Sequence, residues 1–219
     1  MPQVEALVAD LQSCGVPVVF HNGNAASADV RDEALDALQA AMEPGDTVGV
    51  LLHSLAFGTL RPYIGDSGTL GQRHMDMTLD VMAHSLVYWT QALVSRGLLG
   101  EGGRIYAMTS SGSLAAWPSY GAVSAAKSAL ESHIRQLAVE LAPRGVTANA
   151  IMAGVTQTPA LSKIPGADKI AEVAQARNPH GRLTTPEDIA KCLLVLARPE
   201  TAWMTGNVLR VDGGETISA

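Results

Sequence analysis

Three residue types between positions 110 and 127 could together stabilise negative charge that develops on an oxygen. The segment reads SSGSLAAWPSYGAVSAAK and contains Ser110, Tyr120 and, after six intervening residues, Lys127. Reduction of a carbonyl, or of a double bond conjugated to one, places negative charge on oxygen, and a phenol that donates a hydrogen bond or a proton there lowers the barrier. A nearby ammonium group favours phenolate character and can also hold a ribose hydroxyl. These three residues are therefore the candidate catalytic residues.

Less specific explanations exist for the same residues. A Tyr and a Lys at this spacing also arise by chance, as a surface Tyr and a solvated Lys. Ser110 could simply cap the turn that follows it. The wider order of elements must therefore support a catalytic role.

Short apolar runs that alternate with helical patterns predict an α/β fold with a parallel sheet. Because each apolar run is nearly continuous, the sheet should be covered on both faces, as in a doubly wound Rossmann-like fold. No linker or internal repeat interrupts the pattern, so we expect a single domain over residues 1–219. The predicted strands are 16–20, 47–52, 103–111, 146–154 and 207–214. The predicted helices are 4–11, 28–42, 74–96, 120–142 and 186–197, with a further short helix within 155–185.

The composition indicates which partners to expect. Lys and Arg total 15 against 21 Asp and Glu, for a net charge of −6, which gives no electrostatic footprint for nucleic acid or an anionic membrane. We expect a small-molecule substrate instead. Cys14 and Cys192 stand at no metal-ligand spacing, so we expect no metal site and no disulfide framework. No run has the length of a membrane span or the pattern of an export signal, so we expect a cytoplasmic protein.

Five ordered segments resemble the short-chain dehydrogenase/reductase family, and within it the enoyl-acyl-carrier-protein reductase branch. Four residues before Lys127, where most of that family carries Tyr, stands Val123, whereas a Tyr with six residues before the Lys is the arrangement of this branch. Seven residues on one straight helix span about 10 Å, so we expect the Tyr120 phenol to reach the site from the start of the helix. Besides the Tyr120–Lys127 segment, the resemblance rests on HSLAF (53–57), LAVELAPRGVTANAI (137–151), AGVTQTPA (153–160) and TGNVLRVDGG (205–214).

The resemblance implies NAD or NADP as the cofactor. It places Asn24 and Ala25 at the adenine side, although Asn in such a loop is as often turn chemistry. It places Thr156 and Thr158 at the nicotinamide side. The residues that it implies for cofactor binding are Asn24, Ala25, Ser54, Leu55, Lys127, Gly154, Thr156 and Thr158.

One family feature has no counterpart in the sequence. The family begins with a strand, a glycine-rich turn and a helix, whose backbone N–H groups meet the cofactor pyrophosphate. The only early glycine-containing cluster, HNGNAAS (21–27), lacks that glycine spacing. We therefore expect an N-terminally truncated sheet in which the first βαβ unit is absent. Another chain could fill the resulting slot, the sheet could close in an altered form, or the sequence could start at a downstream Met of a longer product.

Three functions are compatible with these residues. The first is an NAD(P)H-dependent oxidoreductase. The family resemblance implies that it reduces an enoyl thioester in fatty-acid or polyketide-type metabolism. The second is a non-redox subunit that pairs with a full-length paralogue. The third is cofactor-free isomerisation or cyclisation in the Tyr120 pocket. Retention of Tyr120 and Lys127 favours the first, and the missing phosphate loop favours the second. The family also implies homo-oligomers, either dimers or tetramers, built through the long helices.

Overall fold

The computed structural model describes residues 2–159, 161–164 and 166–218. Its contacts divide the chain into two compact units, Met1–Asp46 and Thr47–Ala219. The single domain expected from the sequence stays a prediction.

The first unit contains two helices. These are α1 (Pro2–Ser13) and α2 (Ala28–Ala41), and both agree with the predicted helices. The strand predicted at residues 16–20 is wrong, because this segment has no regular secondary structure. Its apolar side chains are largely exposed, with Phe20 at 54%. A β-branched run forms a strand only where a neighbouring strand supplies hydrogen bonds, and the described residues of this unit include no such neighbour.

The second unit is built on a four-stranded parallel sheet, which confirms the predicted α/β class and four of the five predicted strands. Every adjacent pair is parallel, and the strands follow one another in chain order across the sheet. Ser110 pairs with Ala153, so the carboxyl ends of the two central strands meet at the same edge. The strands are β1 (Val50–His53), β2 (Arg104–Ser110), β3 (Thr147–Ala153) and β4 (Val208–Val211).

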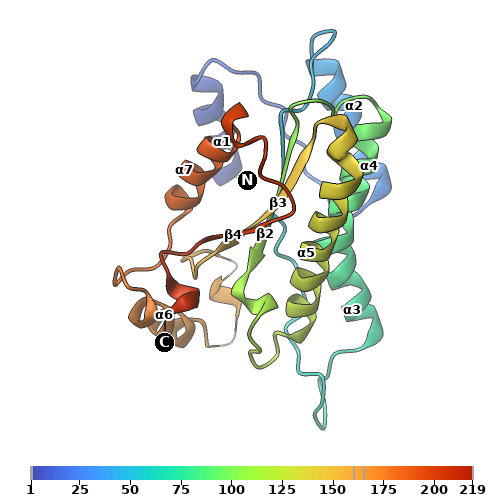
Figure 1. The fold of residues 1–219 in the computed structure, drawn as a ribbon. Coiled ribbons are helices and arrows are strands. Elements are labelled where there is room, and N and C mark those ends of the chain that lie inside the picture. The colour runs from blue at the N-terminus through green and yellow to red at the C-terminus, as the bar shows by residue number, and fades with distance from the viewer. Residues whose placement is uncertain (1, 160, 165, 219) are drawn as a thin grey trace. The chain divides into compact units, whose positions relative to one another are not determined.

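Helices cover both faces of this sheet (Figure 1). On one face, α5 (Gly121–Leu141) packs on β2 and β3, and its inner side is the apolar stripe that the sequence predicts. On the other face, Ile189 and Leu196 of α7 (Pro186–Leu196) pack against Tyr106 and Ile151. The remaining α-helices are α3 (Gln72–Leu79), α4 (Ser85–Ser95) and α6 (Ala167–Arg177). Single 3₁₀ turns span Ser111–Ser113, Ala142–Arg144, Leu161–Lys163, Pro199–Thr201 and Glu215–Ile217.

A π-helical segment, Asp80–His84, interrupts the single long helix predicted over residues 74–96. Met82 and Ala83 of this segment are buried. Directly after it, the Ser85 hydroxyl donates to the Val81 carbonyl oxygen at 2.7 Å. Wide turns of this kind occur often at functional sites. This one presents Met82 to a cleft at the carboxyl edge of the sheet.

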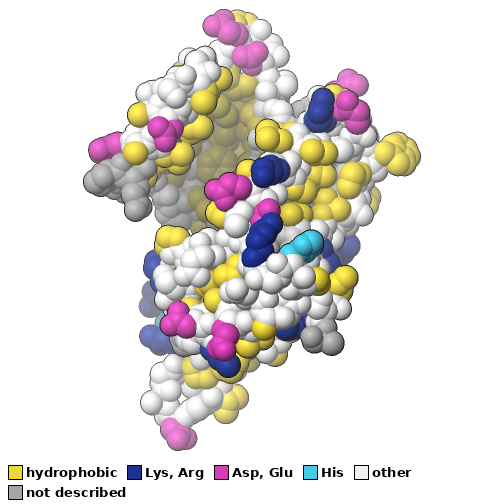
Figure 2. Space-filling model, turned by 90° about the vertical axis from the view of Figure 1, so that its left-hand side faces the viewer, with side chains coloured by type: hydrophobic (Ala, Val, Ile, Leu, Met, Phe, Trp, Pro, Cys, Tyr) yellow, Lys and Arg dark blue, Asp and Glu magenta, His cyan; other side chains and the backbone are white. Residues whose placement is uncertain are grey.

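Acidic and basic side chains are scattered among apolar ones over the face drawn in Figure 2. No helix in the described part of the chain is long and apolar enough to cross a membrane.

Candidate active site

A cleft of about 760 Å³ opens where β2 and β3 end. Ligands of open parallel sheets bind beyond the carboxyl ends of the strands, and this volume lies in the range of small-molecule sites. Asn24 and Ala25 belong to the first unit, so their part in a site stays a prediction. The cleft brings together the other residues singled out from the sequence, namely Ser54, Leu55, Ser110, Tyr120, Lys127, Gly154, Thr156 and Thr158.

Tyr120 lies at the start of α5, from where the spacing predicts that its phenol reaches the site. It is the residue before the first helical turn, with φ −94° and ψ 2°. Its ring packs against the buried cluster of Met82, Val123 and Ala126. The ring also lies close to Gly112, where an added Cβ would overlap it. The position of the ring is therefore restricted by packing against the cluster and against Gly112.

Burial raises the pKa of Tyr120, and a hydrogen bond with the Ser110 side chain partly opposes the rise. The phenol accordingly keeps its proton at neutral pH and can donate it to a ligand oxygen. Ser110 also caps the turn that follows β2, because its hydroxyl oxygen accepts the Gly112 N–H at 3.0 Å. The prediction that Ser110 caps the turn is therefore confirmed, and its catalytic role stays a prediction.

Lys127 is buried, with 5% of its surface exposed, and its ammonium group spans two strand ends. Nζ donates to the Met108 carbonyl oxygen at 2.7 Å and to the Leu55 carbonyl oxygen at 3.4 Å. Burial lowers the pKa of this lysine to about 8, against the attraction of Glu131. An ammonium group has three N–H donors, so one donor remains for a ligand among the described contacts.

Residues that follow β3 form another wall of the cleft. The Thr156 hydroxyl donates to the Gly154 carbonyl oxygen at 2.9 Å, and the Thr158 hydroxyl oxygen accepts the Leu161 N–H at 3.2 Å. Gly154 allows close approach here, because an added Cβ would collide with Thr184 Oγ1 and lie 2.8 Å from Glu215 Oε2. A side chain at position 154 would therefore displace these two residues.

Glu215 is a cleft residue that the sequence reasoning missed. Its Oε2 accepts the Val155 N–H at 2.9 Å, across 60 positions of sequence. The side chain is 6% exposed, and burial raises its pKa. The available signal was an acidic residue directly after VDGG (211–214), at a strand end of a predicted parallel sheet.

Apolar side chains line the rest of the cleft. They come from the loop after β1, from the π-helical segment, from the turn after β2 and from α6. Such a lining suits a ligand with a hydrocarbon portion next to a polar reacting group. The apolar lining includes Phe57, Leu60, Met82, Leu114, Trp117, Ile164, Ile170 and Val173.

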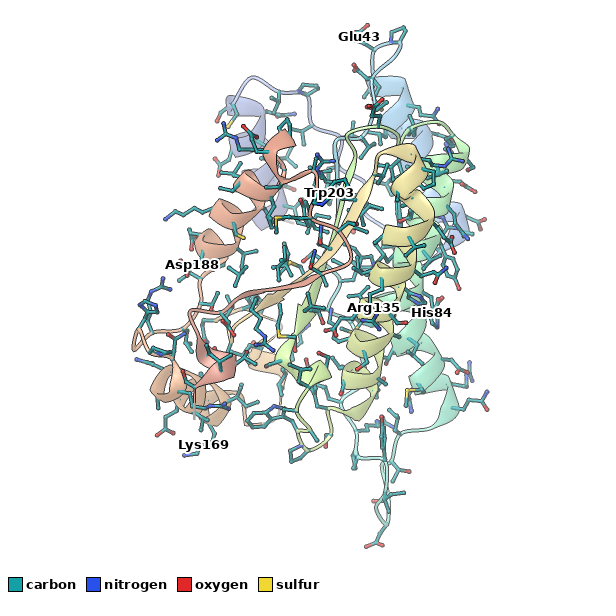
Figure 3. All side chains as sticks on the ribbon, in the orientation of Figure 1. Glu43, His84, Arg135, Lys169, Asp188 and Trp203 are labelled. Atoms are coloured by element: carbon teal, nitrogen blue, oxygen red, sulfur yellow. The ribbon has the colours of Figure 1, made fainter. Side chains whose placement is uncertain are left out.

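The histidines near the site form polar pairs. His53, at the end of β1, is buried and lies with Nε2 2.8 Å from Ser85 Oγ. Burial and the charge of Lys127 lower the pKa of His53 to about 4. His84 lies in the layer of outer helices (Figure 3), with Nδ1 3.0 Å from His133 Nε2. The described residues include no group of three or more His, Cys, Asp or Glu that could hold a metal.

The nicotinamide-ribose end of a dinucleotide fits this cleft. The remaining N–H donor of Lys127 suits a ribose hydroxyl. The Thr156 and Thr158 side chains line the same cleft.

A parallel sheet between helices, with a Tyr and a Lys over the carboxyl ends of its strands, defines a Rossmann-like protein of the short-chain dehydrogenase/reductase class. A sequence model described as "Enoyl-(Acyl carrier protein) reductase" matches residues 3–216. The chain therefore belongs to the enoyl-(acyl carrier protein) reductase family.

Individual relatives agree with this assignment. The chain is 31% identical to a 1-cyclohexenylcarbonyl-CoA reductase of Streptomyces collinus, over 84% of this chain and 69% of that protein. It is 34% identical to an enoyl-[acyl-carrier-protein] reductase [NADH] of a Nostoc species, over 77% of this chain and 64% of that protein. Among solved structures, an enoyl-[acyl-carrier-protein] reductase (NADH) of Aquifex aeolicus VF5 matches with a TM-score of 0.86 and 25% identity, over 100% of this chain and 84% of that one. The chain thus spans about two thirds of the length of the Streptomyces and Nostoc proteins.

Proposed function

We propose that the chain is an NAD(P)H-dependent reductase of an α,β-unsaturated acyl thioester. The observation that carries the proposal is the common cleft of Ser110, Tyr120 and Lys127 at the carboxyl ends of β2 and β3. A bound NADH or NADPH supplies the hydride that reduces the β-carbon. The Tyr120 phenol hydrogen-bonds the thioester oxygen and stabilises the negative charge that develops there. Ser110 orients the phenol through its hydrogen bond.

Lys127 acts on the cofactor side in this proposal. Its ammonium group is fixed by the Met108 and Leu55 carbonyl oxygens and presents its third N–H to a ribose hydroxyl. Ser54 and Leu55 would contact the same ribose region, and Gly154, Thr156 and Thr158 would line the nicotinamide side. Asn24 and Ala25 are proposed for the adenine.

The apolar lining supports an acyl substrate. Leu114, Trp117 and Ile164 would cover the hydrocarbon chain and exclude water from the reacting carbons. One relative is named for a CoA thioester and another for an acyl-carrier-protein thioester, so both carriers are candidates. A role in fatty-acid or polyketide-type metabolism follows from this substrate class.

Calorimetric titration with NADH and NADPH, followed by a spectrophotometric assay with 2-butenoyl-CoA, tests the proposal. We expect saturable cofactor binding and substrate-dependent loss of the NAD(P)H absorbance. NADH is the first choice, because the Nostoc and Aquifex relatives are named for it. Absence of cofactor binding at millimolar concentration would overturn the stand-alone reductase and favour a non-redox subunit.

We also propose that the protein is a homo-oligomer. Tyr88 on α4 and Val139 on α5 expose apolar surface, at 37% and 73% of their areas. Light scattering coupled to size-exclusion chromatography measures the assembly. A mass near 22.8 kDa would contradict this proposal.

A further inference from the structure

The π-helical segment Asp80–His84 is completed by a side-chain hydrogen bond. The Ser85 N–H donates to the Asp80 carbonyl oxygen, five residues earlier, and therefore not to that of Val81, four residues earlier. The Val81 carbonyl oxygen accepts the Ser85 hydroxyl instead, at 2.7 Å. Ser85 is fully buried, so no solvent can replace this donor. The hydroxyl thus stabilises a carbonyl oxygen that the wide turn deprives of its usual N–H.

The Ser85 hydroxyl is itself held by His53, at the end of β1. His53 Nε2 lies 2.8 Å from Ser85 Oγ, and both side chains are buried. A hydroxyl has one hydrogen, and that of Ser85 is directed to Val81, so Oγ accepts and Nε2 carries the donated proton. His53 Nδ1 is buried without a partner among the described residues. A chain of two hydrogen bonds therefore connects the end of a strand to the wide turn.

The wide turn supplies part of the surface against which Tyr120 packs. Met82 is 2% exposed and forms a buried cluster with Val123 and Ala126 of α5. Val81 and the Tyr120 ring both pack against this cluster. Met82 also lines the cleft. A shift of the turn would therefore move the surface that supports the ring.

We propose that His53 and Ser85 are positioning residues, which fix the π-helical segment and thereby hold Met82 in the surface that supports the Tyr120 ring. Neither residue is part of the cleft lining, so each acts through Val81 and Met82 and not on a ligand. The kinetic consequence rests on the proposed function, in which the phenol stabilises charge on the substrate. Displacement of such a group by about 1 Å can lower a rate by about a hundredfold.

Removal of the Ser85 hydroxyl tests this inference. Ser85→Ala leaves the cleft lining intact, so we expect kcat for 2-butenoyl-CoA to fall by about tenfold or more, with the KM for NADH within about twofold of wild type. Thr90→Val is the matched control, because the buried Thr90 hydroxyl likewise donates to a carbonyl oxygen four residues earlier, that of Leu86, at 2.8 Å. It should keep the wild-type kcat. A merely structural role would lower Tm in both variants and leave kcat of the folded enzyme unchanged.

Two substitutions of His53 test the other end of the connection. His53→Leu removes the donor to Ser85 and should lower kcat as Ser85→Ala does. His53→Gln retains an N–H donor that can reach Ser85 Oγ, so it should restore most of the lost activity. Since both substitutions remove the imidazole, only the hydrogen bond distinguishes their expected kcat values.

A nuclear magnetic resonance measurement needs no turnover. The chain contains eight methionines, and isotope labelling of their methyl groups gives a signal for each, of which Met82→Leu identifies that of Met82. We expect the Met82 signal to move in Ser85→Ala and in His53→Leu, because the turn shifts relative to the Tyr120 ring. The signal should keep its wild-type position in Thr90→Val.

The outcomes separate this inference from the proposed function. If the wild-type chain reduces no enoyl thioester, the proposed function fails, and the Met82 signal still decides the inference. If a folded Ser85→Ala keeps both the wild-type Met82 signal and the wild-type kcat, the inference alone is overturned. Equal losses of kcat in His53→Gln and His53→Leu would overturn it too, and this comparison also decides if Ser85→Ala does not fold.

Discussion

Lys127 Nζ lies 2.7 Å from the carbonyl oxygen of Met108, two residues before the end of β2. This hydrogen bond ties the first half of α5 to the strand that carries Ser110. It also explains how a lysine can be buried at 95% without a carboxylate bonded to its ammonium group. Main-chain carbonyl oxygens solvate the charge only in part, and the pKa of about 8 reflects that remaining cost.

The low pKa of Lys127 predicts a pH-dependent stability. Between pH 8 and the ordinary lysine pKa of 10.5, the unfolded chain holds this proton more strongly than the folded chain. The free energy of unfolding should therefore rise with pH across this window, by about 3 kcal/mol from this group. Urea unfolding at several pH values measures the rise. In Lys127→Met the contribution should vanish, whereas Lys191→Met, at an exposed position of α7, should keep it. Equal slopes in wild type and Lys127→Met would contradict the assignment.

Removal of the Tyr120 hydroxyl should separate catalysis from binding. Tyr120→Phe keeps the ring that packs against Met82 and Val123, so we expect the fold and the Kd for NADH to change little. The rate of 2-butenoyl-CoA reduction should fall by about 10²- to 10⁴-fold, because the developing charge loses its proton donor. Tyr88→Phe, in α4, is the matched control. A Tyr120→Phe enzyme with wild-type kcat would exclude the phenol from the reaction.

The sequence predicted most of the framework of the second unit because each of its strands is an apolar run with at least one partner strand. β2 and β3 form as expected, and their pairing brings Ser110 and Gly154 to one edge. The segment 16–20 has the same strand-like composition, but the described residues of its unit include no neighbouring strand. Composition alone therefore did not predict its conformation correctly. Strand formation depends on a partner that local sequence does not specify.

The cleft residues that the sequence singled out either share one segment or lie in segments that resemble the family, whereas Glu215 was missed. Ser110, Tyr120 and Lys127 fall within 18 positions, and their spacing carried the inference. Glu215 meets Val155 only through the pairing of β3 with β4, which no local pattern reveals. The π-helical turn at Met82 was missed because one extra residue in a turn barely changes the apolar periodicity.

Gly112 should prove necessary for the position of Tyr120. A Cβ at residue 112 would overlap the Tyr120 ring and lie 3.1 Å from Ser110 Oγ. The backbone of Gly112 does not require positive φ, so Gly112→Ala should fold while it displaces the phenol. We expect kcat to fall by about 10-fold or more with a modest loss in Tm. Gly100→Ala, where an added Cβ meets nothing within 4 Å, should keep wild-type kcat. Equal kcat values in the two variants would show that the ring tolerates the added methyl group.

Acid should destabilise the protein through His53. Its pKa is about 4 in the folded chain and 6.5 in the unfolded chain, because burial disfavours the imidazolium and Lys127 adds repulsion. Below pH 6.5 the His53 imidazole is protonated in the unfolded chain, whereas in the folded chain it becomes protonated only near pH 4. The contribution of His53 to stability is therefore complete above pH 6.5 and is lost on the way to pH 4, at a cost of about 3 kcal/mol.

Chemical denaturation between pH 4 and pH 7 measures this loss. His53→Gln removes the titrating ring and retains a polar group that can reach Ser85, so its free energy of unfolding should vary less with pH than that of the wild type. His180→Gln, at an exposed position, serves as the control and should retain the wild-type dependence. If His53→Gln loses stability between pH 7 and pH 4 as steeply as the wild type, the assignment to His53 is wrong. Asp212 cannot supply that loss, because its pKa is lowered from 3.8 and its contribution disappears only below about pH 4.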